Sequence, residues 1–290
     1  MGSSHGLLYA ISQIMDDFSV AETQWNNFCS NVIADWLGSW TFWDPQTGKV
    51  SRSFKCIRSF KALNDDKSIV VHRNIRMDHT IQPDRGPWEI RKEDTDDHGF
   101  FHPVFPQART VLYSNGGGVL AMRQITDSDP VALEIFLCRG DHRCGVIVSY
   151  NESKELRSFG TIREKEKNAE IEMWSPSTKL RESFPLSDFA EDFIGVEKTF
   201  DSNLQISLVS DCKWNKDFWL GTKGTDDSEN LLFKFLPDTI CLLCPRQVST
   251  KAFSVRACVL FTNEEDKELQ ELTLSYVDGR LHSIKQGVYH

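Results

Sequence analysis

Clusters of turn-forming residues divide most of this chain into short runs that are rich in β-branched and aromatic residues. After Trp40 these clusters lie at Gly48, 64–66, 84–87, 115–118 and 127–130. The runs between them have the length and composition of β-strands and recur at regular spacing. The strand-like runs are 53–60, 68–75, 108–114, 119–125, 132–138 and 144–150. This pattern predicts an antiparallel barrel or sandwich, and the lack of alternating strand and helix units argues against a doubly wound sheet.

The segment from Val20 to Trp40 precedes these strands and has the apolar periodicity of one amphipathic helix. Ser19 is a predicted N-cap with Glu22 three residues later, and Gly38 lies where such a helix can end. The apolar stripe consists of Val20, Trp25, Phe28, Val32, Ile33 and Trp36. We therefore expect an N-terminal helix that covers one end of a β-barrel.

An internal repeat indicates how the 290 residues divide, since this length exceeds that of a typical single domain. Ser149-Tyr150 and Ser275-Tyr276 each end a strand-like run, and each is followed by a turn and a second run. A repeated unit of this kind predicts two similar domains in tandem. With the boundary in a charged, turn-rich segment, the domains are 15–164 and 165–290. The strands expected in the second domain are 204–210, 231–235, 239–243, 252–261 and 271–276.

Charge and cysteine content limit the partners and the compartment. The formal net charge of −9 argues against a nucleic-acid partner. The eight cysteines lie mostly among apolar neighbours, which predicts buried, reduced thiols. Residues 1–18 lack a basic segment and a long apolar run, so we predict neither a signal peptide nor a membrane span. The expected location is cytoplasmic, or the chloroplast if a leader has been removed.

A set of short motifs is spread along the chain. The motifs are Trp36-Leu37-Gly38-Ser39-Trp40, Ile57-Arg58-Ser59-Phe60, Ser149-Tyr150, Ile162-Arg163-Glu164, Leu236-Pro237-Asp238, Pro245-Arg246-Gln247-Val248 and Ser275-Tyr276 with Asp278-Gly279. Together they resemble the tandem lipocalin-like (calycin) proteins of cyanobacteria, algae and plants. The resemblance implies two calycin-type barrels and a relation to phycobiliprotein lyases, which hold an open-chain tetrapyrrole and deliver it to a cysteine of an acceptor protein. The second domain departs from the pattern, because 194–197 lacks the tryptophan expected after Gly195.

Polar residues inside apolar strand runs are candidate ligand contacts, because a barrel of about eight strands can enclose one small molecule. Strand parity places Arg109 and Tyr113 on one face, and Arg123 on the face of its own strand that carries Val119. If these faces point inward, they form a cationic pocket suited to a carboxylate. Trp88, in the polar loop 84–101, is a candidate lid. The predicted ligand-binding residues are Arg58, Trp88, Arg109, Tyr113, Arg123 and Arg139.

Two other groups of residues do not predict a metal site. Loop 94–102 contains three aspartates with His98 and His102, but Gly99 and Pro103 oppose the helix that a His-x-x-x-His ligand pair requires. We therefore expect a solvated loop. Cys241 and Cys244 lie in a strand-like run, where alternation separates their side chains. No metal or other cofactor is predicted.

The sequence thus favours a soluble tandem barrel that binds a hydrophobic, carboxylate-bearing small molecule for carriage or transfer. A bilin-like tetrapyrrole, a terpenoid acid and a fatty acid all fit, and transfer would require an acceptor protein. One alternative is a cofactor-independent isomerase or cyclase that uses Glu134 or His72 as acid or base. Another is an assembly factor that binds proteins through its surface. Signatures of hydrolases, kinases and dehydrogenases are absent from the sequence.

Overall fold

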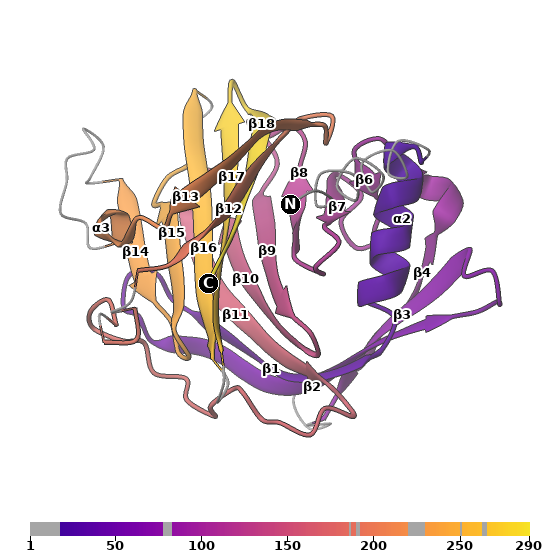
Figure 1. Ribbon diagram of the computed structural model, residues 1–290, viewed down its shortest axis with the longest axis horizontal. Coiled ribbons are helices and arrows are strands. Elements are labelled where there is room, and N and C mark those ends of the chain that lie inside the picture. Colours follow the sequence, from indigo (N-terminus) through magenta and orange to yellow (C-terminus); the bar gives the residue numbers. More distant parts are fainter. Residues whose placement is uncertain are drawn as a thin grey trace, which may run out of the picture.

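The computed structural model describes residues 18–77, 83–185, 187–189, 192–219, 230–249, 251–262 and 266–290. The N-terminal segment and the expected domain start at residue 15 lie outside these ranges. The described chain is nearly all β, as predicted, with two antiparallel sheets and an N-terminal helix (Figure 1). None of its described helices is long and apolar enough to cross a membrane.

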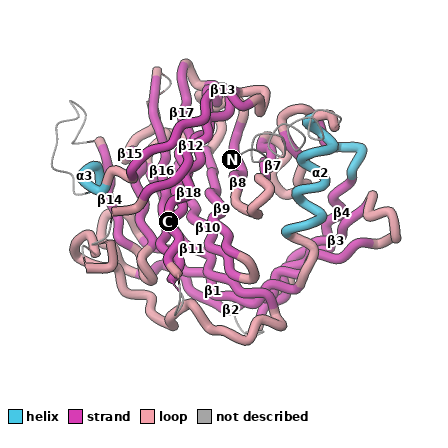
Figure 2. The backbone as a smooth tube through the Cα atoms, in the orientation of Figure 1, coloured by secondary structure: helices cyan, strands magenta, loops and turns pink. Residues whose placement is uncertain are grey.

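The first sheet has eleven strands in the order β4-β3-β2-β1-β11-β10-β9-β8-β7-β6-β5. It curls into a barrel-like shape that is nearly closed, and the long strands β1 and β2 curve beneath it (Figure 2). A 3₁₀ turn, η1, joins the two edge strands β4 and β5. The strands are β1 (Asp35–Trp43), β2 (Val50–Ala62), β3 (Ile69–Arg76), β4 (Arg85–Arg91), β5 (Thr95–Asp96), β6 (Gly99–Phe100), β7 (Ala108–Leu112), β8 (Gly118–Met122), β9 (Val131–Arg139), β10 (His142–Tyr150) and β11 (Leu156–Glu166), with η1 at Lys92–Asp94.

Helix α2 (Val20–Asn31) begins with the predicted capping box, in which Ser19 Oγ accepts from Glu22 N and Glu22 in turn accepts from Ser19 N. The helix ends seven residues before Gly38, and the Trp-x-Gly-x-Trp motif belongs to β1. The predicted helix up to Trp40 was therefore wrong at its C-terminal end. A spacing of four residues between Trp36 and Trp40 fits a strand face as well as a helix face.

Helix α2 lies across the gap between the two edges of the first sheet (Figure 1). Gln24 Oε1 accepts from the backbone N–H of Leu112 at 2.8 Å, and Asn27 Nδ2 donates to the Leu112 carbonyl at 2.8 Å. These two side chains make the hydrogen bonds to the backbone of Leu112 that a neighbouring strand would otherwise make at the end of β7. The buried residues that join α2 to β2, β3, β4, β6 and β7 are Trp25, Phe28, Val32, Phe60, Val70, Ile90, Phe100 and Leu112.

The second sheet has seven strands in the order β13-β12-β18-β17-β16-β15-β14. A tight turn at Asp278-Gly279 connects β17 to β18 with positive φ at both residues, as the sequence predicted for a hairpin. A short helix, α3, precedes β14. The elements are β12 (Ile194–Asp201), β13 (Ile206–Lys213), α3 (Lys216–Trp219), β14 (Leu231–Phe235), β15 (Ile240–Pro245), β16 (Ala252–Thr262), β17 (Lys267–Val277) and β18 (Arg280–Tyr289).

The second sheet packs on the outer face of the first sheet through one large apolar core. The two repeated tyrosines connect the sheets reciprocally. Tyr150 OH donates to the carbonyl of Pro245 at 3.1 Å, and Tyr276 OH donates to the carbonyl of Met122 at 2.8 Å. The outer face of the first sheet is thus structural, which leaves its inner face for a ligand.

Candidate functional site

A cavity of about 700 Å³ lies within the curl of the first sheet. Strand registers show which side chains point into it, because residues paired across an antiparallel ladder share a face. Trp36 pairs with Arg58, Trp40 with Phe54, and Phe42 with Arg52. The apolar lining consists of Phe28, Val32, Trp40, Phe42, Phe60, Trp88, Ile90, Phe100, Phe105, Leu112, Leu120 and Phe136, with others.

Four charged side chains from neighbouring strands meet at one region of the inner face, which we call the floor. Arg58 (β2) and Glu164 (β11) form paired hydrogen bonds, with Nη2 to Oε2 at 2.7 Å and Nε to Oε1 at 3.0 Å. Arg143 (β10) donates from Nε to the same Glu164 Oε2 at 2.7 Å. Glu134 (β9) lies beside them, with its Oε1 3.6 Å from Arg58 Nη1. The floor therefore has two guanidinium groups sharing one carboxylate.

Two glycines make room for the floor carboxylates. A Cβ atom at Gly38 would lie within 3.0 Å of both Glu164 Cγ and the carbonyl oxygen of Arg163. A Cβ atom at Gly145 would lie within 3.0 Å of Glu134 Oε1. The glycine of the Trp-x-Gly-x-Trp motif thus serves close packing of a charged side chain and not the end of a helix.

The floor groups differ in their affinity for protons. Burial opposes the ionisation of Glu164, but Arg143 and Arg58 outweigh that effect and hold the pKa of its carboxyl below the usual value. Burial raises the pKa of Glu134, and Arg58 only partly offsets it. Burial also lowers the pKa of Arg143 to about 10. The two guanidinium groups with Glu164 carry one net positive charge, which Glu134 compensates only as far as it is ionised.

Three buried polar atoms of cavity-lining residues have no hydrogen-bond partner in the described part of the chain. They are Arg143 Nη2, Glu134 Oε1 and Trp40 Nε1. Arg143 is only 6% exposed and its guanidinium lies 3.9 Å from the centre of the Trp36 ring. A buried donor without a partner costs about 1–3 kcal/mol, so an acceptor at this position would recover that cost.

A pair of histidines closes the first sheet where its two edges approach each other. His72 (β3) and His102, which follows β6, are joined by a hydrogen bond of 2.8 Å between Nδ1 and Nε2. The other nitrogen of His72 lies 3.0 Å from Asn74 Oδ1, and Trp88 lies within 6 Å of both rings. Burial lowers the pKa of His72 well below its usual value and that of His102 to about 4. Both rings are therefore neutral at pH 7.

The predicted site residues separate into two groups. Arg58, Trp88, His72 and Glu134 line the cavity, although Trp88 lies on strand β4 and not on the loop that we predicted. The other four lie outside it. Pro87 beside Trp88 is compatible with β4 because β4 is an edge strand.

The residues outside the cavity follow the predicted parity but point outward. Arg109 forms an ion pair with Asp96, and Tyr113 stacks on Phe200 of the second sheet with ring centroids 4.6 Å apart. Arg123 is exposed. Arg139 pairs with acidic residues at 266 and 268 near the contact between the sheets. The inward orientation expected for these faces was wrong, because the second sheet covers the outer face of the first.

Sequence reasoning missed Arg143, Glu164, Asn74 and His102 as members of the site. Arg143, Glu164 and Asn74 lie among buried apolar residues on β10, β11 and β3, and only the strand pairing brings them together. His102 lies outside these strands and joins the site through its hydrogen bond to His72. The described residues contain no group of three or more His, Cys, Asp or Glu side chains that could hold a metal ion. Cys241 and Cys244 belong to different buried clusters on opposite faces of β15.

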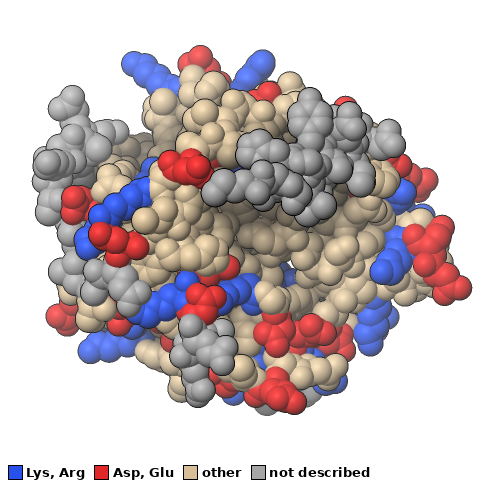
Figure 3. All heavy atoms as spheres, viewed as in Figure 1, with Lys and Arg blue, Asp and Glu red and all other residues tan. Residues whose placement is uncertain are grey.

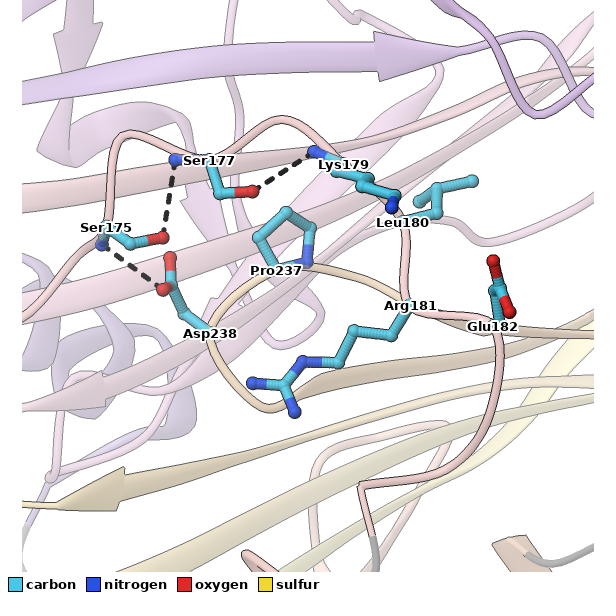
Figure 4. Close-up of a pocket in the computed structure, with 8 residues that line it drawn as sticks. All are labelled: Ser175, Ser177, Lys179, Leu180, Arg181, Glu182, Pro237 and Asp238. Carbon is cyan, nitrogen blue, oxygen red and sulfur yellow. Dashed lines mark hydrogen bonds between the residues drawn. The ribbon is translucent and has the colours of Figure 1, made fainter.

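A second hollow lies outside the first sheet, between the connection that follows β11 and the turn before β15 (Figure 4). Its polar groups are already bonded to each other, as Ser175 N donates to Asp238 Oδ1 at 3.2 Å. Arg163, fully buried behind it, donates to the carbonyls of Ser175 and Ser177 and to Asp238. These contacts anchor the connection between the sheets, so we assign this hollow a structural role.

On the face shown in Figure 3, Lys and Arg side chains are interspersed with Asp and Glu. This distribution agrees with the low pI of about 5.4 and gives no support to binding of a polyanion. The cavity of the first sheet remains the best candidate site.

Comparison with known proteins places the chain in a family. The profile of the N-terminal domain of DUF3598, a domain of unknown function, matches residues 21–169, just over half of the chain. The crystal structure of a DUF3598 protein of unknown function from Nostoc punctiforme is similar, with a TM-score of 0.66 and 14% identity over 92% of this chain and 98% of that one. At this identity the similarity shows the fold alone. No curated protein matches the chain. The chain belongs to the DUF3598 family.

Proposed function

We propose that the first sheet binds a hydrophobic small molecule whose carboxylate lies on the floor of the cavity, for carriage or transfer. The observation that carries this proposal is Arg143 Nη2, a buried cationic donor without a partner among the described residues. Arg143 already uses its Nε atom on Glu164. Nη2 is therefore the donor that we assign to a second, external carboxylate.

The walls and the size of the cavity support an apolar ligand body. Aromatic and aliphatic side chains form most of the lining, and each 100 Å² of apolar ligand surface that they cover contributes about 2.5 kcal/mol. A volume of about 700 Å³ lies within the usual range of small-molecule pockets. A fatty acid, a terpenoid acid or an open-chain tetrapyrrole has the required chemistry, and the resemblance to lipocalin-like proteins agrees with each.

Replacing Arg143 by Gln tests this proposal. We expect the variant to bind hexadecanoic acid at least 30-fold more weakly than the wild type, because a charged hydrogen-bond partner of the carboxylate is lost at a cost of about 2 kcal/mol or more. Titration calorimetry at pH 7.5 measures both proteins. The neutral alcohol of the same chain length, hexadecan-1-ol, is the matched ligand, and its affinity should change little.

Arg123→Gln is the matched protein control, since Arg123 is exposed outside the cavity. Its affinity for hexadecanoic acid should equal that of the wild type. Equal loss of acid and alcohol binding in Arg143→Gln would indicate a collapsed cavity and would count against a carboxylate site at this residue. Absence of acid binding to the wild type would reject the proposed function.

Acid–base turnover of the bound molecule is a second candidate function, favoured by the presence of Glu134 and His72 in one cavity. Burial raises the pKa of Glu134, which favours its acid form, and lowers the pKa of His72, which favours the neutral imidazole. In deuterium oxide, the wild type would then introduce deuterium into a bound unsaturated acid, and Glu134→Gln would not. Mass spectrometry of the recovered acid measures this exchange, and an unlabelled acid from the wild type would contradict turnover.

A further inference from the structure

A second group of arginines lies around the solvent-exposed end of the same cavity. Arg52 on β2, Arg85 on β4 and Arg157 on β11 are exposed and line the cavity, and we call them the mouth arginines. Their position is distinct from the floor, because Arg52 and Arg58 lie on the same face of β2 and are six residues apart. At a rise of about 3.3 Å per residue, their Cα atoms are separated by roughly 20 Å.

The mouth arginines have no protein counter-ion in the described chain. The side chains of Arg52, Arg85 and Arg157 form no ion pair or hydrogen bond with the described residues. Burial lowers the pKa of Arg52, and the positive charge of Arg85 lowers it further. The nearby carboxylate of Asp84 instead accepts from the backbone N–H of Arg76 at 2.8 Å. Among the residues that the structure describes, positive charge is therefore in excess at the mouth.

Aromatic rings connect the mouth to the floor along one wall. The Arg52 guanidinium lies 4.3 Å from the centre of the Phe42 ring and 5.5 Å from that of Phe54. Trp40 continues the wall inward, 5.5 Å from Phe54 between ring centres, and the Arg58 guanidinium lies 5.4 Å from the centre of the Trp40 ring. An aromatic wall thus runs between the mouth and the floor, and the buried Arg76 guanidinium also lies against it, 3.4 Å from the centre of the Phe54 ring. The cation–π contacts hold the guanidinium groups toward this wall.

We propose that the ligand is an elongated apolar molecule with an acidic group at each end, one at Arg143 on the floor and the other at the mouth arginines. This inference rests on the proposed function and names its ligand class. A ligand with one acidic group would leave the mouth arginines without an anion. Charge-assisted hydrogen bonds to the mouth arginines favour the second acidic group.

The test compares hexadecanedioic acid with hexadecanoic acid, which has the same length and one acidic group. The wild type should bind the diacid about ten-fold more tightly than the monoacid in titration calorimetry at fixed ionic strength. The double variant Arg52→Gln/Arg85→Gln should lose this preference while it keeps the wild-type affinity for the monoacid. Arg73→Gln removes one positive charge on the outer face of β3, where Arg73 is exposed, and should keep the preference.

The outcomes separate this inference from the proposed function. Equal affinity of the wild type for the two acids would overturn the second site and leave the floor site standing. A preference for the diacid that survives in the double variant would also overturn it, because the mouth arginines would then not be its source. Failure of both acids to bind would overturn the inference and the proposed function together.

Discussion

The variant Glu164→Gln is expected to unfold with a free energy about 3–5 kcal/mol lower than that of the wild type. The Glu164 side chain is fully buried and is the shared partner of Arg58 and Arg143. A neutral amide in its place leaves two buried guanidinium groups with only the Glu134 carboxyl to compensate them. Urea denaturation monitored by tryptophan fluorescence measures the change.

Glu166→Gln is the matched control, because Glu166 lies on the same strand and is only partly buried. Its stability should stay within about 0.5 kcal/mol of the wild type. A loss below about 1 kcal/mol in Glu164→Gln would show that Glu164 does not compensate the two arginines. High concentrations of hexadecanoate should partly restore Glu164→Gln, since the external carboxylate would supply the missing charge.

Acidification from pH 6.5 to pH 4 is expected to lower the free energy of unfolding through the two histidines, by about 2.5 kcal/mol from His102 alone and by a further amount from His72. Both have a lower pKa in the folded protein than in the unfolded chain, so the unfolded chain binds more protons in this range. Their stabilisation is complete above pH 6.5 and is lost as the pH falls toward 4. Protonation of both rings also removes the acceptor of the His72–His102 hydrogen bond, beside Arg58 and Arg143.

Urea denaturation at several pH values between 7 and 4 measures this effect. The double variant His72→Gln/His102→Gln should be less stable at pH 7 but should lose much less stability over the same range. Carboxylates elsewhere titrate in both proteins, so the difference between the two curves isolates the histidines. Parallel curves would contradict the assignment of the acid sensitivity to this pair.

The sequence predicted those features that depend on local chemistry. The capping box at Ser19, the turn at Asp278-Gly279 and the strand runs on either side of Tyr150 all appear where the residues placed them. Each of these depends on neighbours within a few residues in the chain. The prediction of a nearly all-β fold followed from the same local signals.

The C-terminal end of α2 was mispredicted because the spacing between Trp36 and Trp40 fits both a helix and a strand. A spacing of four residues satisfies both a helix face and a strand face, and only the pairing of β1 with β2 and β11 decides between them. Trp88 was assigned to a loop because Gly86 and Pro87 normally interrupt strands, and its strand lies at a sheet edge where proline is tolerated.

The site could be predicted only in part, because the inner face of a strand is fixed by what covers its outer face. Arg109 and Tyr113 share a face, as parity requires, but the second sheet packs on that face. Arg143 and Glu164 are 21 residues apart and meet through the register of β10 with β11. No pattern within either strand indicates this contact.

We propose that an external carboxylate binds Arg143 on the floor of the first sheet. A crystal structure of the wild-type protein with hexadecanedioic acid tests it most directly. We predict one carboxylate within hydrogen-bond distance of Arg143 Nη2 and the chain along the Trp40 wall. An empty cavity at saturating acid, or a ligand in the cavity with both carboxylates away from Arg143, would contradict the account.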